Sequence, residues 1–459
     1  MRLGNNRQQT GFCSQGQFIA LAITIRVSLR IKPRAPLEGG TEYFLLRLRY
    51  LLPVLALWLL QLGCGDQYRP VANPIVGQGG TPQTAHFAFT VNNNPAGNSS
   101  TIQIDVSGDT NLQTQPAGSG AVAEAFLPGT TAALFTANKL ADSVSEFTTA
   151  INFSPVTTIN LPLGSRPIAV GSQRPGSMYA LNSGSNANCL NTGSVSVINT
   201  SALAVTSTGC VGPNPVAFTQ IADGTKIYVA NQGDNTLSVF NPDLGTVTAI
   251  ITQAMGLGLN PVFLLSSSDA GYVFVINKGD GVSPGSMNII DTTTDTVAAT
   301  MPLGVAPVYA SVDPKLLRLY VANSGSNSIT VLDLSSFNIS NNPPLSTLAT
   351  VSVGSGPVGV TALPDGTRFY TANSISNDVT VVSATSFAVL KTITVGLDPV
   401  WIASEPTSSK VYTANAAGGS VSIIQTVNDS VVTNMNAPPI DPNCSSSCTL
   451  QQPMMILTY

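Results

Sequence analysis

The sequence predicts an all-β protein, a β-propeller of eight four-stranded blades. Three short motifs recur along the 459 residues with a common period, and each has the composition of a strand or of the turn beside it. The 40 Gly and 31 Pro residues indicate many turns between apolar runs. A repeat of this length with four strands per unit has the period of a propeller blade.

The first motif is Tyr-Val-x-Asn or a close variant. It appears as "LFTAN", "MYALN", "YVAN", "VFVIN", "LYVAN", "FYTAN" and "VYTAN", which end at Asn138, Asn182, Asn231, Asn277, Asn323, Asn373 and Asn415. Successive copies lie between 42 residues (Asn373 to Asn415) and 50 residues (Asn323 to Asn373) apart, and a weaker copy ends at Asn92. Tyr and Val favour strands, whereas Asn tolerates left-handed backbone and bonds to its own turn. We therefore expect the Asn to end the second strand of each blade and to be structural.

Two further motifs complete the unit. A Gly-x-x-Pro-Val/Ile segment precedes the Asn, as in "GPNPV" at 212, 19 residues before Asn231. An alternating run such as "NTLSVF" or "NSITVL" follows it, as expected for a half-buried strand. The first strand then starts at Pro-Val, the second ends at Asn, the third is the alternating run and the fourth is of the "TVTAI" type. Radial stacking would bury both apolar faces of such a sheet.

The two ends of the chain predict how the ring closes. Residues 87–117 contain "FAFTVNN" and "TIQIDV", the later strands of a blade, with no first strand before them. The final "QQPMMILTY" at 451–459 has the pattern of a first strand with nothing after it. Joining the two segments gives an eighth blade and covers a sheet edge that would otherwise be exposed. The alternative is seven blades, with 66–117 as an appendage.

The N-terminal region predicts export. "RLRYLLPVLALWLLQLGCGD" at 47–66 has two Arg residues, a short apolar run and Leu-Gly-Cys, the layout of a secretion signal. Its ending resembles a bacterial lipoprotein signal, which implies acylation of Cys64, although Gln61 departs from the aliphatic residue usual at that place. We expect 1–44 to lie upstream of the true start, 45–64 to be the signal, 65–84 a tether and 85–459 the propeller. The expected location is the bacterial cell envelope, with the lipid anchor as the only membrane attachment.

The repeats resemble those of the YVTN family of bacterial β-propeller proteins over residues 85–459. "YVANSGSNSITVLD" and "GSGPVGVTALPDGTRFYTANSISNDVTVV" carry the resemblance. It implies the fold and a periplasmic or cell-surface location. Some related propellers are described as lactonases, which is a fold-level analogy and does not carry an activity.

Charge excludes one class of partner. Residues 1–50 hold eight basic and two acidic side chains of the 19 and 23 in the whole chain, so residues 51–459 hold 11 and 21, a net charge of −10. A protein that binds nucleic acid by neutralising phosphates needs a basic face, which eleven scattered cations do not supply. We therefore expect no nucleic-acid partner.

An enzyme is less favoured than a binding or scaffold module. The single histidine, His86, lies at the margin of the composite blade, and no His/Cys/Asp/Glu cluster has metal-ligand spacing, so we predict no catalytic residue, metal or cofactor. The alternative is a lactonase-type hydrolase, for which Asp398 is the best-placed carboxylate. Loops before the first strand and after the second share one face, whose Ser, Asn and Gly residues suit protein or glycan contact by a monomer.

Two further sets of residues follow from the repeat. Export favours disulfides, and we expect Cys189–Cys210 and Cys444–Cys448. Two residues after each first-strand Pro stand residues of the innermost strands, three of them aromatic: Ala169, Ala217, Phe263, Tyr309, Gly359, Trp401 and Met455. We favour packing between blades for this row, with ligand contact at the channel mouth by Phe263, Tyr309 and Trp401 as the alternative.

Overall fold

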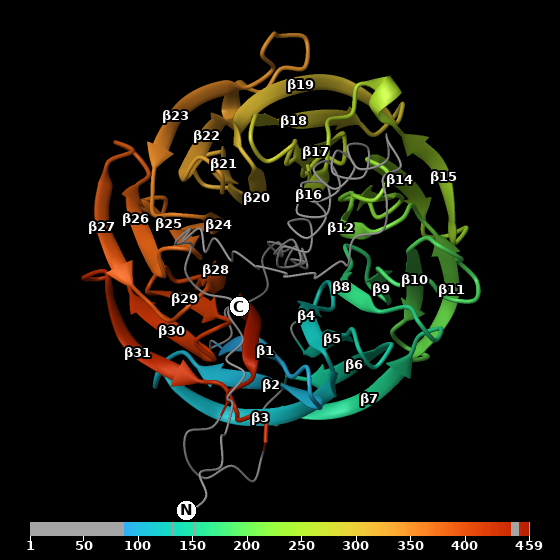
Figure 1. The fold of residues 1–459 in the computed structure, drawn as a ribbon, viewed down its shortest axis with the longest axis horizontal. Coiled ribbons are helices and arrows are strands. Elements are labelled where there is room, and N and C mark those ends of the chain that lie inside the picture. The colour runs from blue at the N-terminus through green and yellow to red at the C-terminus, as the bar shows by residue number, and fades with distance from the viewer. Residues whose placement is uncertain (1–86, 131, 150–152, 442–448, 459) are drawn as a thin grey trace, which may run out of the picture. The chain divides into compact units, whose positions relative to one another are not determined.

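The computed structural model describes residues 87–458 apart from 131, 150–152 and 442–448. In these ranges 32 strands form eight four-stranded antiparallel sheets, which radiate from a common centre as a ring (Figure 1). The eight-bladed prediction is confirmed, and the seven-bladed alternative is wrong. The described residues belong to one compact unit, Arg69–Tyr459. Several predictions fall outside the described residues. They concern the N-terminal segments 1–44, 45–64 and 65–84, and the residues Cys64, His86, Cys444 and Cys448.

Blade 1 is built from both ends of the chain. Its strands are β1 (Phe87–Asn93), β2 (Asn98–Asp105), β3 (Thr110–Ser119) and β32 (Gln452–Thr458). The sheet order is β3-β2-β1-β32, so the last strand of the chain is the innermost strand of the first blade. Phe89 pairs with Leu457 and Val91 with Met455, and a bulge follows before Asn92 pairs with Pro453. The predicted closure is therefore confirmed.

The other seven blades each use four consecutive strands, innermost strand first. Blade 2 consists of β4 (Ala121–Phe126), β5 (Ala133–Asn138), β6 (Ser143–Thr148) and β7 (Ser154–Asn160). Blade 3 consists of β8 (Pro167–Gly171), β9 (Ser177–Asn182), β10 (Ser194–Asn199) and β11 (Ala204–Cys210). Blade 4 consists of β12 (Pro215–Gln220), β13 (Ile227–Asn231), β14 (Thr236–Asn241) and β15 (Thr246–Ile251). Blades 5 and 6 consist of β16 (Pro261–Ser266), β17 (Tyr272–Asn277), β18 (Pro284–Asp291), β19 (Thr296–Val305); and β20 (Pro307–Asp313), β21 (Arg318–Asn323), β22 (Ser328–Asp333), β23 (Ser346–Ser352). Blades 7 and 8 consist of β24 (Pro357–Ala362), β25 (Arg368–Asn373), β26 (Asp378–Ser383), β27 (Val389–Thr394); and β28 (Pro399–Ser404), β29 (Lys410–Asn415), β30 (Ser420–Gln425), β31 (Ser430–Asn436). Two 3₁₀ turns, η1 (Gln253–Met255) and η2 (Leu334–Ser336), lie between strands.

The motif Asn ends the second strand and ties it to the third. In each of the seven strong copies, the Asn side-chain nitrogen donates to two side-chain oxygens at the start of the third strand, at 2.7–3.3 Å. Asn231, for example, donates to Thr236 and Ser238. Asn92 makes the equivalent bond to Ser100. The expected structural role of the Asn is thus seen in all eight blades.

The Gly of Gly-x-x-Pro lies directly over this Asn. A Cβ on Gly212 would stand 2.5 Å from Cγ of Asn231, and one on Gly396 would stand 2.7 Å from the side-chain nitrogen of Asn415. Such distances are too short for any side chain, so the loop approaches the Asn only with Gly at this place. The first strand then begins at the Pro, which pairs with the same Asn, as Pro215 does with Asn231.

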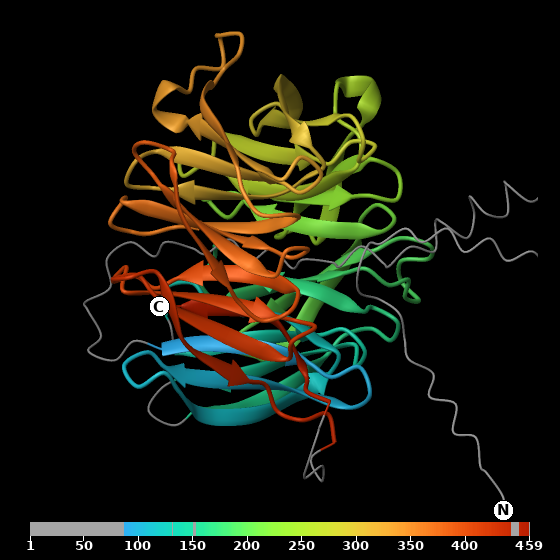
Figure 2. The same ribbon diagram turned by 60° about the vertical axis from the view of Figure 1, so that its left-hand side comes forward.

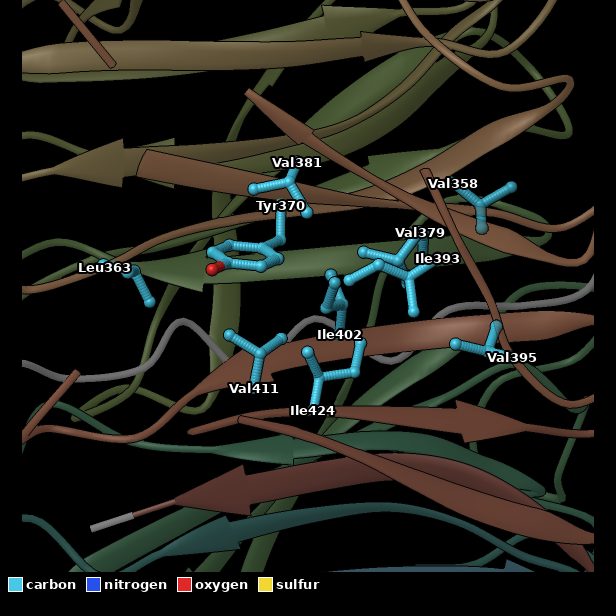
Figure 3. Packing of buried hydrophobic residues seen from close by; sticks show 11 residues of the cluster. Val358, Leu363, Tyr370, Val379, Val381, Ile393, Val395, Ile402, Val411 and Ile424 are labelled. Atoms are coloured by element: carbon cyan, nitrogen blue, oxygen red, sulfur yellow. The ribbon is translucent and has the colours of Figure 1, made fainter. Parts of the chain in front are cut away.

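Apolar side chains fill the space between neighbouring blades. Figure 3 shows one such interface, between blades 7 and 8, where Tyr370, Val379 and Val381 face Ile402 and Val411. Apolar side chains of the two blades meet there, whereas the fourth strands at the rim are mostly exposed or half-buried. Radial stacking therefore buries both faces of each sheet, as the repeat predicts.

The strand directions divide the turns between two opposite faces of the ring (Figure 2). One face carries the turns between the second and third strands and the connections from one blade to the next, and we call it the asparagine face. The other carries the turns between the first and second and between the third and fourth strands. Most of the charged turn residues lie there, and we call it the aspartate face.

Candidate functional site

The aspartate face joins neighbouring blades by a recurring polar contact. Lys226, at the base of β13 in blade 4, donates to Asp295 of blade 5 at 2.8 Å, and the hydroxyl of Tyr228 donates to the same carboxylate. Arg368 and Tyr370 of blade 7 hold Asp429 of blade 8 in the same way, at 2.6 and 2.5 Å.

Other junctions keep one part of this contact or replace it. Lys410 of blade 8 pairs with Asp109 of blade 1 at 2.5 Å, and Arg174 of blade 3 pairs with Asp243 of blade 4. At the junction of blades 6 and 7, Phe387 stands where the Asp would be, and the guanidinium of Arg318 lies 5.0 Å from its ring centre. Charged side chains of this face therefore add polar contacts between neighbouring blades, whose interfaces are mainly apolar.

The innermost strands bring the three predicted aromatic residues together. The ring centres of Phe263 and Tyr309 lie 4.6 Å apart, and those of Tyr309 and Trp401 lie 5.8 Å apart. Tyr309 belongs to blade 6 and Trp401 to blade 8, and Gly359 of blade 7 is the small residue between them. All three aromatic side chains are buried, and the indole nitrogen of Trp401 donates to the carbonyl of Ile456 at 3.0 Å. Ligand contact by this row stays a prediction.

Asp398 sits in the turn before β28. Its backbone is left-handed, with φ 54°, and its N–H donates to the side-chain oxygen of Asn377 in the preceding blade at 2.7 Å. Its carbonyl accepts from the N–H of Ala416 at 2.9 Å. The backbone of this residue thus positions the turn, and its role in a lactonase-type reaction stays a prediction.

The asparagine face exposes aliphatic side chains at the tips of its turns. The exposed residues are Leu140, Leu163, Leu190, Leu259, Val282, Ile375 and Leu397. Leu163 and Val282 are 88% and 82% exposed, so their side chains make almost no contact within the fold. Isolated exposed leucines are ordinary, but several on the loops of one face mark a candidate binding surface.

Two of these side chains, Leu140 and Ile375, stand two residues after the motif Asn, a position that is Gly in blades 3 to 6. In blades 3 to 6 the residue before the Pro has a side chain (Arg166, Asn214, Asn260 and Ala306), and Gly stands two residues after the motif Asn (Gly184, Gly233, Gly279 and Gly325). Blades 2 and 7 have the reverse, Gly120 with Leu140 and Gly356 with Ile375. A Cβ on Gly120 would lie 2.5 Å from Leu140, so there is space for only one of the two side chains. The exchange places an aliphatic group on the turn tip.

A disulfide fixes the longest turn insertion of blade 3. Cys189 and Cys210 are bonded, as predicted, which ties the loop after Asn182 to the end of β11. Inside this loop the buried Asn186 accepts from the N–H of Asn188 and donates to Ser165 and Ser194. Leu190 is nevertheless 72% exposed at the surface of this loop.

The buried carboxyl of Glu124 is the least expected polar group of the inner strands. It is fully buried at the junction of blades 1 and 2, where Oε2 accepts from the Thr101 hydroxyl at 3.3 Å and Oε1 has no hydrogen-bond partner among the described residues. Burial raises the pKa of this carboxyl well above its usual range, against the smaller opposite effects of the Thr101 hydroxyl and the Leu457 N–H.

The described ranges show neither a metal cluster nor a membrane-spanning helix. They contain no group of three or more His, Cys, Asp or Glu side chains placed to hold a metal ion. No helix among them has the length and apolarity needed to cross a bilayer. Asp280, in the turn between β17 and β18, accepts from the N–H groups of Val282 and Ser283, so it acts as a turn residue.

Comparison with known proteins gives no assignment. No family model and no curated protein matches the chain. Among solved structures, hydrazine synthase from Kuenenia stuttgartiensis aligns over 68% of this chain and 99% of its own, with 18% identity and a TM-score of 0.49. A likeness at that score carries no argument about function, and the fold rests on the strands and sheets described above.

Proposed function

We propose that the protein is an extracytoplasmic, lipid-anchored binding or scaffold module, and that its asparagine face binds a protein or glycan. The observation that carries the proposal is a difference between the two faces. Several charged side chains of the aspartate face are paired across blade junctions, whereas the asparagine face exposes seven aliphatic turn-tip side chains on Ser-, Asn- and Gly-rich loops, against three (Leu244, Leu317 and Val427) on the aspartate face. Loops held by a rigid scaffold are where binding sites usually lie.

Two parts of the proposal, export of the protein and its membership of a repeat family, rest on the sequence. Cys64 would carry the acyl group, and residues 65–84 would tether the propeller to the envelope surface. The Cys189–Cys210 disulfide supports an oxidising compartment, because such bonds are rare in reducing cytosol. The motifs at Asn231, Asn323 and Asn373 support membership of the YVTN-type repeat proteins, and a binding role in that setting requires no catalytic residue.

The test compares two double variants of matched exposure. Leu163→Asp with Val282→Asp changes the asparagine face, and Leu244→Asp with Val427→Asp changes the aspartate face, where those two side chains are 67% and 86% exposed. Each purified protein is incubated with the envelope fraction of the source organism, and the retained share is measured. We expect the first variant to lose retention and the second to keep it.

Two results would contradict the proposal. Retention that depends only on Leu244 and Val427 would place binding on the aspartate face. Turnover in a screen of lactones, abolished by Asp398→Asn, would favour the hydrolase in place of the binding module. Both double variants should keep the melting temperature of the parent protein, because their side chains are exposed.

A further inference from the structure

Three leucines of the asparagine face occupy adjoining turns of blades 2 and 3. Leu140 lies two residues after Asn138, Leu163 lies in the turn before β8, and Leu190 lies in the disulfide-bonded loop. We call these three residues and their turns the leucine sector. Asp142, two residues after Leu140, accepts from the N–H of Gly164 at 2.8 Å. A Cβ on Gly164 would stand 2.6 Å from the carbonyl oxygen of Ser185, so the loop that bears Leu190 touches the turn that bears Leu163.

Two cations stand in the same sector. Lys139 directly precedes Leu140, and Arg166 directly precedes the first residue of β8. Burial, and after it the neighbouring Arg166 guanidinium, lowers the pKa of the Lys139 ammonium, so the two cations are close together. Asp142 is the only acid in segments 139–142, 161–166 and 183–193, which gives two cations and one anion, a net charge of +1, in a chain whose residues 51–459 carry −10.

We infer that the leucine sector binds a segment of a partner protein that presents apolar side chains together with carboxylates, which specifies the partner of the proposed binding face and rests on that proposal. Leu163 and Leu190 supply apolar area that no other described residue covers, on loops that are already fixed by the disulfide and by the bonds of Asn186. A preformed loop also lowers the entropy lost on binding. The exposed Arg166 supplies the charge complementarity that selects carboxylates, with the half-buried Lys139 in the same sector.

Other classes of partner fit this sector less well. Insertion into a bilayer surface is favoured by aromatic side chains and by clusters of many cations, and the three segments of the sector contain neither. A neutral glycan could bond to the Ser and Asn side chains of 183–193, but it would leave the leucines uncovered and the cations without a carboxylate. A protein segment can cover the three leucines and pair with the two cations at once.

The experiment uses a random dodecapeptide library displayed on phage and selected on the immobilised full chain. The affinity of each recovered peptide is then measured by fluorescence polarisation. The proteins compared are the parent, the double variant Leu163→Ser with Leu190→Ser, the single variant Arg166→Ser, and two control variants. Ile375→Ser lies elsewhere on the asparagine face, and Leu244→Ser lies on the aspartate face. We expect peptides rich in apolar residues and Asp or Glu, at least about tenfold weaker binding by the leucine double variant and by Arg166→Ser, and unchanged binding by both controls.

The contrary outcomes are separable. Peptides that depend on Ile375 and not on the leucine sector would overturn this inference and leave the asparagine face as the binding face. Peptides that depend on Leu244 would overturn both proposals. Recovery of no peptide, or of peptides without carboxylates, would overturn the inference, as would sedimentation with phosphatidylglycerol vesicles that is lost in the leucine double variant.

Discussion

The indole nitrogen of Trp401 donates a hydrogen bond to the backbone carbonyl of Ile456 at 3.0 Å. Trp401 belongs to β28, the innermost strand of the last full blade, and Ile456 belongs to β32, the strand that completes the first. The bond therefore crosses the junction at which the two ends of the chain close the ring. Trp401 is also only 5% exposed, so its fluorescence reports on that junction.

Deletion of residues 450–459 should destabilise the protein strongly. It removes Met455, Ile456 and Leu457, which are buried, and burial of each such side chain is worth roughly 1.5–3 kcal/mol, so we expect a loss of about 5 kcal/mol or more. It also exposes the edge of β1. Denaturant unfolding measures the loss, and a Trp58→Phe background leaves Trp401 as the only tryptophan. Full-length protein should show blue-shifted emission that acrylamide quenches poorly, and an unchanged unfolding midpoint after deletion would contradict the closure.

The Asp295 contact should contribute more to stability than its exposed counterpart. Asp295 accepts from Lys226 and from the Tyr228 hydroxyl and is half-buried, so Asp295→Ala should lower the free energy of unfolding by about 2–3 kcal/mol. Asp243, which pairs with Arg174 in solvent, is the control, and Asp243→Ala should lower it by less than about 1 kcal/mol. Urea unfolding at low and high salt compares the two. Equal losses in both variants would show that the Tyr–Asp contact adds nothing.

Glu124 should make the protein less stable as the pH rises. Its pKa in the folded protein is raised above the ordinary value of 4.5, so the unfolded chain releases the proton first. The contribution is fully present below about pH 4.5 and is lost progressively as the pH rises through the raised pKa. Glu124→Gln should therefore be as stable as the parent near pH 4 and more stable at pH 8. Chemical unfolding across this range decides it, and a variant that is less stable than the parent at pH 8 would contradict the prediction.

The Cys189–Cys210 disulfide closes a short loop, with a sequence separation of 21. Chain entropy predicts that Cys189→Ser with Cys210→Ser costs about 3 kcal/mol. Unfolding measured with and without reductant should show that loss in the parent and a smaller effect of reductant on the variant, which keeps only the predicted Cys444–Cys448 pair. The Cys444–Cys448 pair stays a prediction outside the described residues, and peptide mapping without reductant tests it. Free thiols there, or a link between Cys189 and Cys444, would contradict the expected pairing.

Much of the fold could be predicted because its signals are local. The Asn of the repeat, the Pro that starts each first strand and the two incomplete ends are visible within single units of the sequence. The contacts between units are not. Tyr228 bonds an Asp 67 residues away, and whether that Asp is present differs from junction to junction. A single unit does not show which of two facing positions must be Gly. Comparison of blades 2 and 3 shows it, because Gly120 and Leu140 in blade 2 correspond to Arg166 and Gly184 in blade 3.

The candidate site was less predictable for the same reason. The sequence indicated which loops share a face, because the repeat fixes the order and direction of the strands. It did not indicate that the loops of Leu163 and Leu190 adjoin, since they meet through contacts between separate segments, such as that of Gly164 with Ser185 and the bond from Asn186 to Ser165. It also did not indicate Glu124, whose burial depends on how blade 1 packs on blade 2. The sequence indicated that Phe263, Tyr309 and Trp401 belong to one row of the innermost strands, and in the structure the ring of Tyr309 lies next to those of the other two.

We propose that the asparagine face binds a partner, whereas paired charges of the aspartate face join neighbouring blades. The most direct test of this proposal places the photo-crosslinking amino acid benzoylphenylalanine at position 163 or at position 244 in the protein within its own cells. Both positions are exposed turn tips, one on each face. Irradiation should give a discrete adduct from position 163 and none from position 244. Adducts from position 244 alone, or equally from both, would contradict the account.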